Sequence, residues 1–173
     1  GINLSRDNST LVVNGKFWAY VLNATSGALR VDFEVANTES RIALNANASV
    51  LAIAELSGFI KVYTWSPPQS RYNLLWLYRI PAGIATNWGS AVDLSADGLT
   101  LMAGSLVFLS SGYDGTIYMF DTFGDGTPLW VYPNVGDEIS QVVLSDDGSI
   151  GAAISWGDYP RTKPNIFAFE RNS

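Results

Sequence analysis

The chain has 173 residues, of which 47% are hydrophobic and 15% charged, and its formal net charge is −6. A chain this apolar and weakly charged buries enough surface to offset the entropy of ordering, which argues against intrinsic disorder and favours one packed domain. The ten lysines and arginines are scattered, and no apolar run reaches the roughly 20 residues of a membrane-spanning helix. Nucleic-acid binding and membrane insertion are therefore not expected.

The first 40 residues predict four short β-strands joined by polar turns. An inner strand leads to the phrase Leu4-Ser-Arg-Asp-Asn, which is followed by a short apolar run at Leu11–Val13. An alternating aromatic strand at Phe17–Val21 comes next, and Leu29–Phe33 forms the fourth strand. Alternation of period two between turn residues predicts antiparallel strands.

The same order of elements recurs three more times along the chain. The motif that starts at Leu4 recurs as Leu44-Asn-Ala-Asn-Ala, Leu94-Ser-Ala-Asp-Gly and Leu144-Ser-Asp-Asp-Gly. From one leucine to the next the steps are 40, 50 and 50 residues. The apolar runs that follow are Val50–Ala54, Leu99–Ala103 and Ile150–Ile154, and the aromatic strands are Phe59–Tyr63, Thr116–Phe120 and Asn165–Phe169. Leu75–Tyr78 and Pro128–Tyr132 supply fourth strands, whereas the last copy has none.

Self-similarity at 40–50 residues with four strands per unit predicts an all-β propeller of antiparallel blades. We expect a single domain, 1–173, with blades at about 1–40, 41–90, 91–140 and 141–173, the last lacking its outer strand. In the third copy, Asp97-Gly98 and Asp114-Gly115 predict hairpin turns. A closed sandwich does not explain the 50-residue steps.

The sequence motifs of the repeats resemble those of two known propeller families. Asp114–Asp121, followed by a glycine-bearing turn and Leu129-Trp130, resembles the pyrroloquinoline-quinone-like, or quinoprotein-like, repeat. The Leu-Ser-x-Asp-Gly turns resemble those of WD-type repeats. The resemblance implies propeller architecture only. Family members that bind the quinone have a vicinal cysteine pair and a calcium-binding acidic site, and this chain has no cysteine, so no cofactor is expected.

The sequence lacks the commonest catalytic groups. It contains neither histidine nor cysteine, which removes the usual general base, the thiolate nucleophile and zinc sites. The adjacent pairs Asp137/Glu138 and Asp146/Asp147 lie beside predicted turns, where aspartate caps its own backbone. Asp121–Gly126 lacks the later bidentate glutamate of a calcium loop. We therefore expect no catalytic or metal site; the alternative is a carboxylate-based glycan hydrolase or lyase.

Sequons and tryptophans provide the candidate surface sites. The sequons begin at Asn8, Asn23 and Asn47, each at a predicted turn, which predicts N-glycosylation and an extracellular or cell-surface location. Trp76 and Trp130 share one register in successive copies, which predicts packing between blades. Trp88 and Trp156 lie in glycine-flanked loops and are the candidates for an exposed contact.

These features predict a structural or interaction protein rather than an enzyme. Because the last blade would end in an unpaired strand edge, we expect head-to-tail self-assembly into a filament, a surface layer or a closed ring, with copies of itself or other proteins as partners. The alternatives are an intracellular or secreted scaffold, a ligand-binding module, and a fragment of a larger propeller.

Overall fold

A computed structural model describes residues 1–35, 40–81, 83, 85–158 and 160–171. Apart from one 3₁₀ turn at Pro67–Gln69, the described elements are β-strands, which form four antiparallel sheets. The first sheet contains β1 (Ile2–Leu4), β2 (Thr10–Asn14), β3 (Trp18–Asn23) and β4 (Leu29–Glu34). The second contains β5 (Ser40–Leu44), β6 (Val50–Glu55), β7 (Phe59–Ser66) and β8 (Arg71–Arg79).

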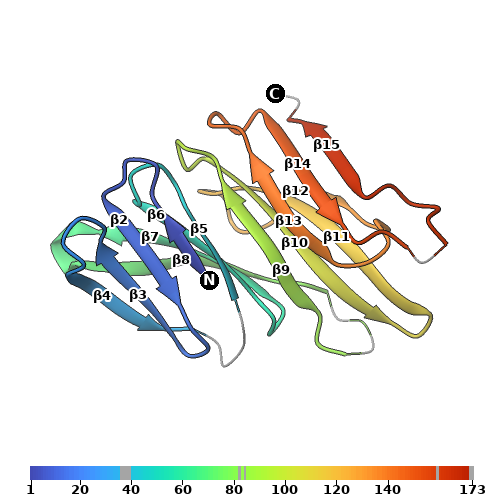
Figure 1. Cartoon of the computed structure of the whole chain (residues 1–173), viewed down its shortest axis with the longest axis horizontal. Coiled ribbons are helices and arrows are strands. Elements are labelled where there is room, and N and C mark those ends of the chain that lie inside the picture. Colours follow the sequence, from blue (N-terminus) through green and yellow to red (C-terminus); the bar gives the residue numbers. More distant parts are fainter. Residues whose placement is uncertain (36–39, 82, 84, 159, 172–173) are drawn as a thin grey trace.

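The remaining strands form the third and fourth sheets. The third contains β9 (Trp88–Leu94), β10 (Thr100–Leu109), β11 (Gly112–Asp121) and β12 (Pro128–Tyr132). The fourth contains β13 (Ile139–Leu144), β14 (Ile150–Ser155) and β15 (Ile166–Glu170). Consecutive sheets pack side by side as blades of a β-propeller (Figure 1). This confirms the predicted four-bladed fold and the three-stranded last blade.

The first and second strands of each blade are joined by a turn that the sequence repeat encodes. In the third blade the Ser95 hydroxyl donates to Asp97 Oδ1 at 2.6 Å, and Asp97 Oδ1 also accepts the Leu99 N–H at 2.9 Å. Gly98 closes the turn at φ +77°, a left-handed conformation that favours glycine. Ser145, Asp147 and Gly148 repeat these interactions and this conformation in the last blade.

These turns also join one blade to the next near the propeller axis. Three backbone hydrogen bonds run in series: Asp7 N to Ala46 O, Ala46 N to Ala96 O, and Ala96 N to Asp146 O, at 2.8–3.0 Å. The inner strands also line a pocket of about 250 Å³. The Asp93 carboxylate lines this pocket and accepts the Leu144 N–H at 2.7 Å, which links the third blade to the fourth.

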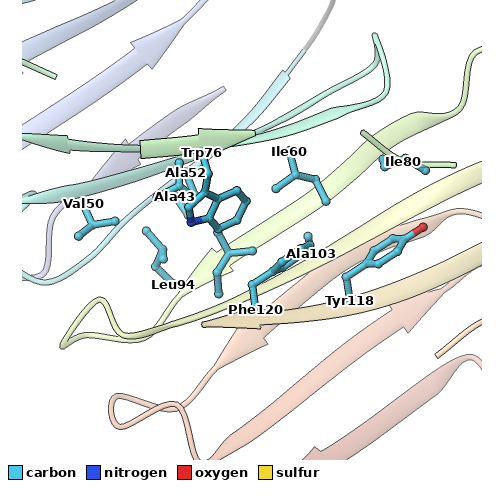
Figure 2. Close-up of a cluster of buried hydrophobic side chains, with 12 residues drawn as sticks. Ala43, Val50, Ala52, Ile60, Trp76, Ile80, Leu94, Ala103, Tyr118 and Phe120 are labelled. Atoms are coloured by element: carbon cyan, nitrogen blue, oxygen red, sulfur yellow. The ribbon is translucent and has the colours of Figure 1, made fainter. Parts of the chain in front are cut away.

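The core lies between blades and contains a repeated aromatic contact. Trp76 and Tyr78, on the outer strand of the second blade, pack against Phe120 and Tyr118 of the third, with ring centroids 5.2–5.5 Å apart. In Figure 2 the indole of Trp76 points toward Phe120, and its Nε1–H donates to the Thr122 carbonyl oxygen at 2.7 Å.

The same contact recurs between the third and fourth blades. Trp130 and Tyr132 pack there against Phe167 and Phe169, at 5.0–5.8 Å. The shared register of Trp76 and Trp130 therefore does reflect packing between blades, as the sequence predicted.

One predicted turn is wrong. Asp114-Gly115 does not form a hairpin turn but lies inside β11, where Gly115 pairs with Leu106 of β10. A Cβ atom at Gly115 would lie 2.2 Å from the Asp137 carbonyl oxygen, so glycine is required by the close approach of the β12–β13 connection. The Asp114 carboxylate accepts the N–H groups of Asn134 and Gly136 from that connection.

Candidate functional site

The alternating strand directions give the propeller two different faces. We call the face with the β1–β2 and β3–β4 turns, and their equivalents in later blades, the hairpin face. The opposite face, which carries the β2–β3 type turns and the connections between blades, is the connection face. The candidate surface residues divide between these two faces.

The three sequons all lie on the hairpin face. Asn8 and Asn47 occupy the β1–β2 and β5–β6 turns and are exposed, with Asn8 in the left-handed region at φ +57°. Asn23 is half-buried at the end of β3, and its Oδ1 accepts the N–H groups of Thr25 and Ser26 in the β3–β4 turn. No contact described here depends on whether these residues carry glycans, so glycosylation stays a prediction.

The two candidate tryptophans both lie on the connection face, in different environments. Trp88 begins β9 and is partly buried; its ring packs edge-on against Phe108 at a centroid distance of 5.0 Å. Trp156 follows β14 and is 70% exposed. Trp156 therefore has the more accessible ring of the two, and its role as a contact residue stays a prediction.

The adjacent carboxylate pairs are engaged in the turns that hold them. Asp147 accepts hydrogen bonds from the Ser149 N–H and from the Ser145 and Ser149 hydroxyls, and these lower the pKa of its carboxyl to about 2. Asp146 forms an ion pair with Arg6, which joins the last blade to the first. Asp137 Oδ1 accepts the Glu138 N–H at 2.7 Å, and burial raises the pKa of Glu138.

The acidic loop between β11 and β12 is a self-contained turn. Asp121 Oδ1 accepts the Phe123 N–H, and Asp125 Oδ1 accepts the Thr127 N–H. In the part of the chain that the structure describes, no group of three or more acidic side chains is arranged to hold a metal ion. The described residues likewise contain no helix long and apolar enough to cross a bilayer.

The outer faces of the two end blades carry exposed apolar side chains. On the first blade, the first end face comprises Ile2, Leu4, Leu11, Val13, Trp18, Tyr20 and Leu22. On the fourth, the last end face comprises Val143, Ile150, Ala152, Ile154, Ile166 and Ala168. None of these side chains is fully buried, and Ile2 and Ile166 are each 72% exposed. Contiguous apolar patches of this kind mark interaction surfaces.

The sequence reasoning did not identify these end faces, although a signal was present. A strand with one solvated face normally alternates apolar and polar residues. In β14, however, Ile150, Ala152 and Ile154 alternate with the inward positions Gly151 and Ala153, so both faces of the strand are apolar. A strand apolar on both faces predicts that both faces are covered.

Comparisons with known proteins support the fold and nothing narrower. No protein-family model and no curated protein matches the sequence. Among solved structures, the chain is similar to the β-propeller domain of Myceliophteria thermophila Cps50 (Swd1), with 12% sequence identity and a TM-score of 0.72. The match covers 99% of this chain and 52% of that domain, so the chain spans about half its length. The resemblance to WD-type repeats is thus supported at the level of propeller architecture, and quinoprotein-specific features are not.

Proposed function

We propose that this chain is a non-enzymatic interaction module: a secreted or cell-surface glycoprotein whose propeller assembles head to tail into a filament or surface layer. The observation that carries the proposal is the pair of apolar end faces. They are different surfaces on opposite ends of the blade array, so contact between unlike faces of two copies is heterologous and can repeat.

The internal interfaces indicate how the first end face would be covered. By strand register, Tyr20 and Leu22 occupy the positions on β3 that Tyr118 and Phe120 occupy on β11. In the third blade those positions receive the aromatic pair of the preceding blade. The first end face therefore matches the face of the third blade that packs against the preceding blade. In a second copy, the last end face would present apolar aliphatic side chains to it.

The sequons and the missing catalytic groups support the rest of the proposal. Glycans at Asn8, Asn23 and Asn47 would project from the hairpin face of the first two blades, a face perpendicular to the blade-to-blade contacts. They would shield a surface that carries few charges and leave the connection face open. The absence of histidine and cysteine removes the commonest catalytic side chains.

A specific observation favours one alternative, a scaffold propeller with more blades. The chain matches about half of the Cps50 (Swd1) domain, so further blades of a longer chain would cover both end faces. In that case neither face is a contact between copies, and the native protein has a mass well above 18.7 kDa.

The test combines native mass with substitutions on one end face. We expect the isolated chain to associate with rising concentration in sedimentation velocity, and Ile154→Lys to shift it toward a monomer by placing a charge in the apolar contact. Leu99→Lys is the matched control, because Leu99 is similarly exposed but lies in a hairpin-face turn. A wild-type chain that stays monomeric at all concentrations contradicts self-assembly, and a longer native chain supports the scaffold alternative.

A further inference from the structure

The connection face of the last blade contains a surface cavity of about 660 Å³ that no function above uses. It lies between the β14–β15 loop and the β12–β13 connection. Its lining residues are Asp137, Trp156, Gly157, Asp158, Arg161, Lys163 and Asn165. The end faces and the sequons are elsewhere, so this cavity is independent of the proposed assembly.

The two segments that form the cavity are held together by a close backbone approach and by two hydrogen bonds. Gly136 has φ +107°, and a Cβ atom there would lie 2.6 Å from the carbonyl carbon and oxygen of Gly157. The Lys163 ammonium donates to the Asn134 carbonyl oxygen at 2.7 Å. The Trp156 N–H donates to the Glu138 carbonyl oxygen at 3.1 Å, which fixes the backbone that carries the indole.

The β14–β15 loop is closed by its own hydrogen bonds. The Asp158 carboxylate accepts the Lys163 N–H at 2.8 Å and the Thr162 hydroxyl. These bonds lower the pKa of the Asp158 carboxyl, with the Thr162 bond making the largest contribution. The Asn165 carbonyl oxygen accepts the Ser155 N–H at 2.9 Å, which ties the end of the loop to β14. The cavity is thus formed before any ligand arrives, which reduces the entropic cost of binding.

The chemistry of the lining selects a particular kind of ligand. An indole that is 70% exposed offers a flat apolar surface. Around it stand two carboxylates, Asp137 and Asp158, and two cationic groups, Arg161 and Lys163, so the formal charges cancel. Because the lining has no net formal charge, neither an anion nor a cation gains a net electrostatic attraction to it, and a purely apolar ligand would leave the polar groups without partners.

We propose that this cavity binds a neutral saccharide, with one sugar ring stacked on Trp156 and its hydroxyls bonded to the polar rim. A pyranose has an apolar face of C–H groups and hydroxyls that both donate and accept hydrogen bonds. Carboxylates accept from such hydroxyls, and the guanidinium of Arg161 and the amide of Asn165 donate to them. The apolar indole and the polar rim of the cavity then each contact a complementary part of one ligand.

The test measures binding of neutral trisaccharides to the full chain. The probes are maltotriose, cellotriose, mannotriose and triacetylchitotriose, with the acidic trigalacturonate for comparison, and the readouts are tryptophan fluorescence and saturation-transfer NMR. We expect at least one neutral trisaccharide to bind with a Kd at or below about 10 mM. Trp156→Ala should weaken this binding about tenfold, and Trp156→Phe should retain most of it.

Two further variants separate the site from the fold. Tyr113→Ala removes another exposed aromatic side chain of the connection face that does not line the cavity, and it should leave binding unchanged. Arg161→Ala removes a rim donor on an exposed side chain and should weaken binding several-fold even if Trp156→Ala lowers stability. Equal binding of a neutral trisaccharide by Trp156→Ala, Arg161→Ala and the wild type overturns the proposal.

A second arm identifies the source of the sugar. Immobilised ribonuclease B, which carries a neutral oligomannose glycan, is compared with the unglycosylated ribonuclease A. Retention on the first alone assigns the cavity to protein-linked glycans, and binding of free trisaccharides alone assigns it to free or polymeric carbohydrate. Absence of both kinds of binding overturns the proposal while leaving the head-to-tail assembly, which uses other surfaces, unaffected.

Discussion

At the scale of single residues, the repeated turn is stabilised by local hydrogen bonds and by glycine in the left-handed region. Gly148 combines two constraints, because it has φ +66° and a Cβ atom there would lie 2.5 Å from Thr100 Oγ1 of the preceding blade. Gly27, in the β3–β4 turn, has a similar φ of +70° with open space around it. A substitution at Gly27 therefore reports backbone strain alone, whereas the same substitution at Gly148 reports backbone strain together with a steric clash.

We expect Gly27→Ala to lower the free energy of unfolding by about 1 kcal/mol, the cost of a left-handed alanine. Gly148→Ala should cost at least about twice as much, because the new methyl group also displaces Thr100. Urea denaturation monitored by tryptophan fluorescence measures both values. Equal losses in the two variants would show that the turn moves freely away from the neighbouring blade.

Asp147, in the turn of the last blade, makes stability depend on pH at the acid end. The hydrogen bonds to Asp147 hold the pKa of its carboxyl at about 2 in the folded chain, below the ordinary value of 3.8. The unfolded chain thus binds the proton more readily, so this contribution to stability is complete above about pH 4 and is lost as pH falls toward 2.

We therefore expect the free energy of unfolding to fall between about pH 4 and pH 2, and to fall less steeply in Asp147→Asn. Urea denaturation at half-unit pH steps measures the slope of each curve. An identical slope in the variant and the wild type would mean that the carboxylate bonds of this turn do not survive in solution.

At the scale of elements, the blades are joined by outer-strand aromatics that reach into the next blade. Trp76 on β8 is only 7% exposed and combines a ring contact with a buried hydrogen bond to Thr122. Leu77, its neighbour on the same strand, points the other way and is 49% exposed. At this point of β8 the contribution to stability should therefore come from the face that carries Trp76.

Trp76→Ala should lower the free energy of unfolding by about 3–5 kcal/mol, because it leaves a cavity between two blades. Trp76→Phe keeps a ring but leaves the Thr122 carbonyl oxygen unpaired, at a cost of about 1–3 kcal/mol. Leu77→Ala should cost less than about 1 kcal/mol. Equilibrium denaturation measures all three, and a loss in Leu77→Ala comparable to that in Trp76→Ala would contradict the assignment of the two faces.

At the scale of the whole molecule, the described residues form one hydrophobic cluster at each contact between consecutive blades, whereas the two end faces remain exposed. If end faces of neighbouring copies cover each other, association stabilises the folded state by mass action. The melting temperature of the wild type should then rise with protein concentration, whereas that of Ile154→Lys should not. Differential scanning calorimetry over a hundredfold range of concentration measures this, and a constant melting temperature in the wild type would count against association.

The sequence by itself determined the repeat, the number of blades and the packing role of Trp76 and Trp130. These features are encoded locally: Ser, Asp and Gly at fixed spacing close each turn within five residues, and alternation of period two sets which side chains face a neighbouring blade. The same local signals placed Asn8 and Asn47 in turns, whereas Asn23 is the last residue of β3. Local signals sufficed for the turns because each turn depends on residues close together in the chain.

Only the tertiary structure decided where separate segments meet. Asp114-Gly115 carries a turn signal but lies in a strand, because its glycine accommodates a connection some 20 residues further on. The cavity beside Trp156 likewise exists because residues 134–138 lie against residues 156–158 and 161–165, which follow β14. The balance of acidic and basic side chains around the cavity depends on which segments lie side by side. The exposure of the end faces depends on how the blades are arranged. Neither feature is encoded in a local pattern of residues.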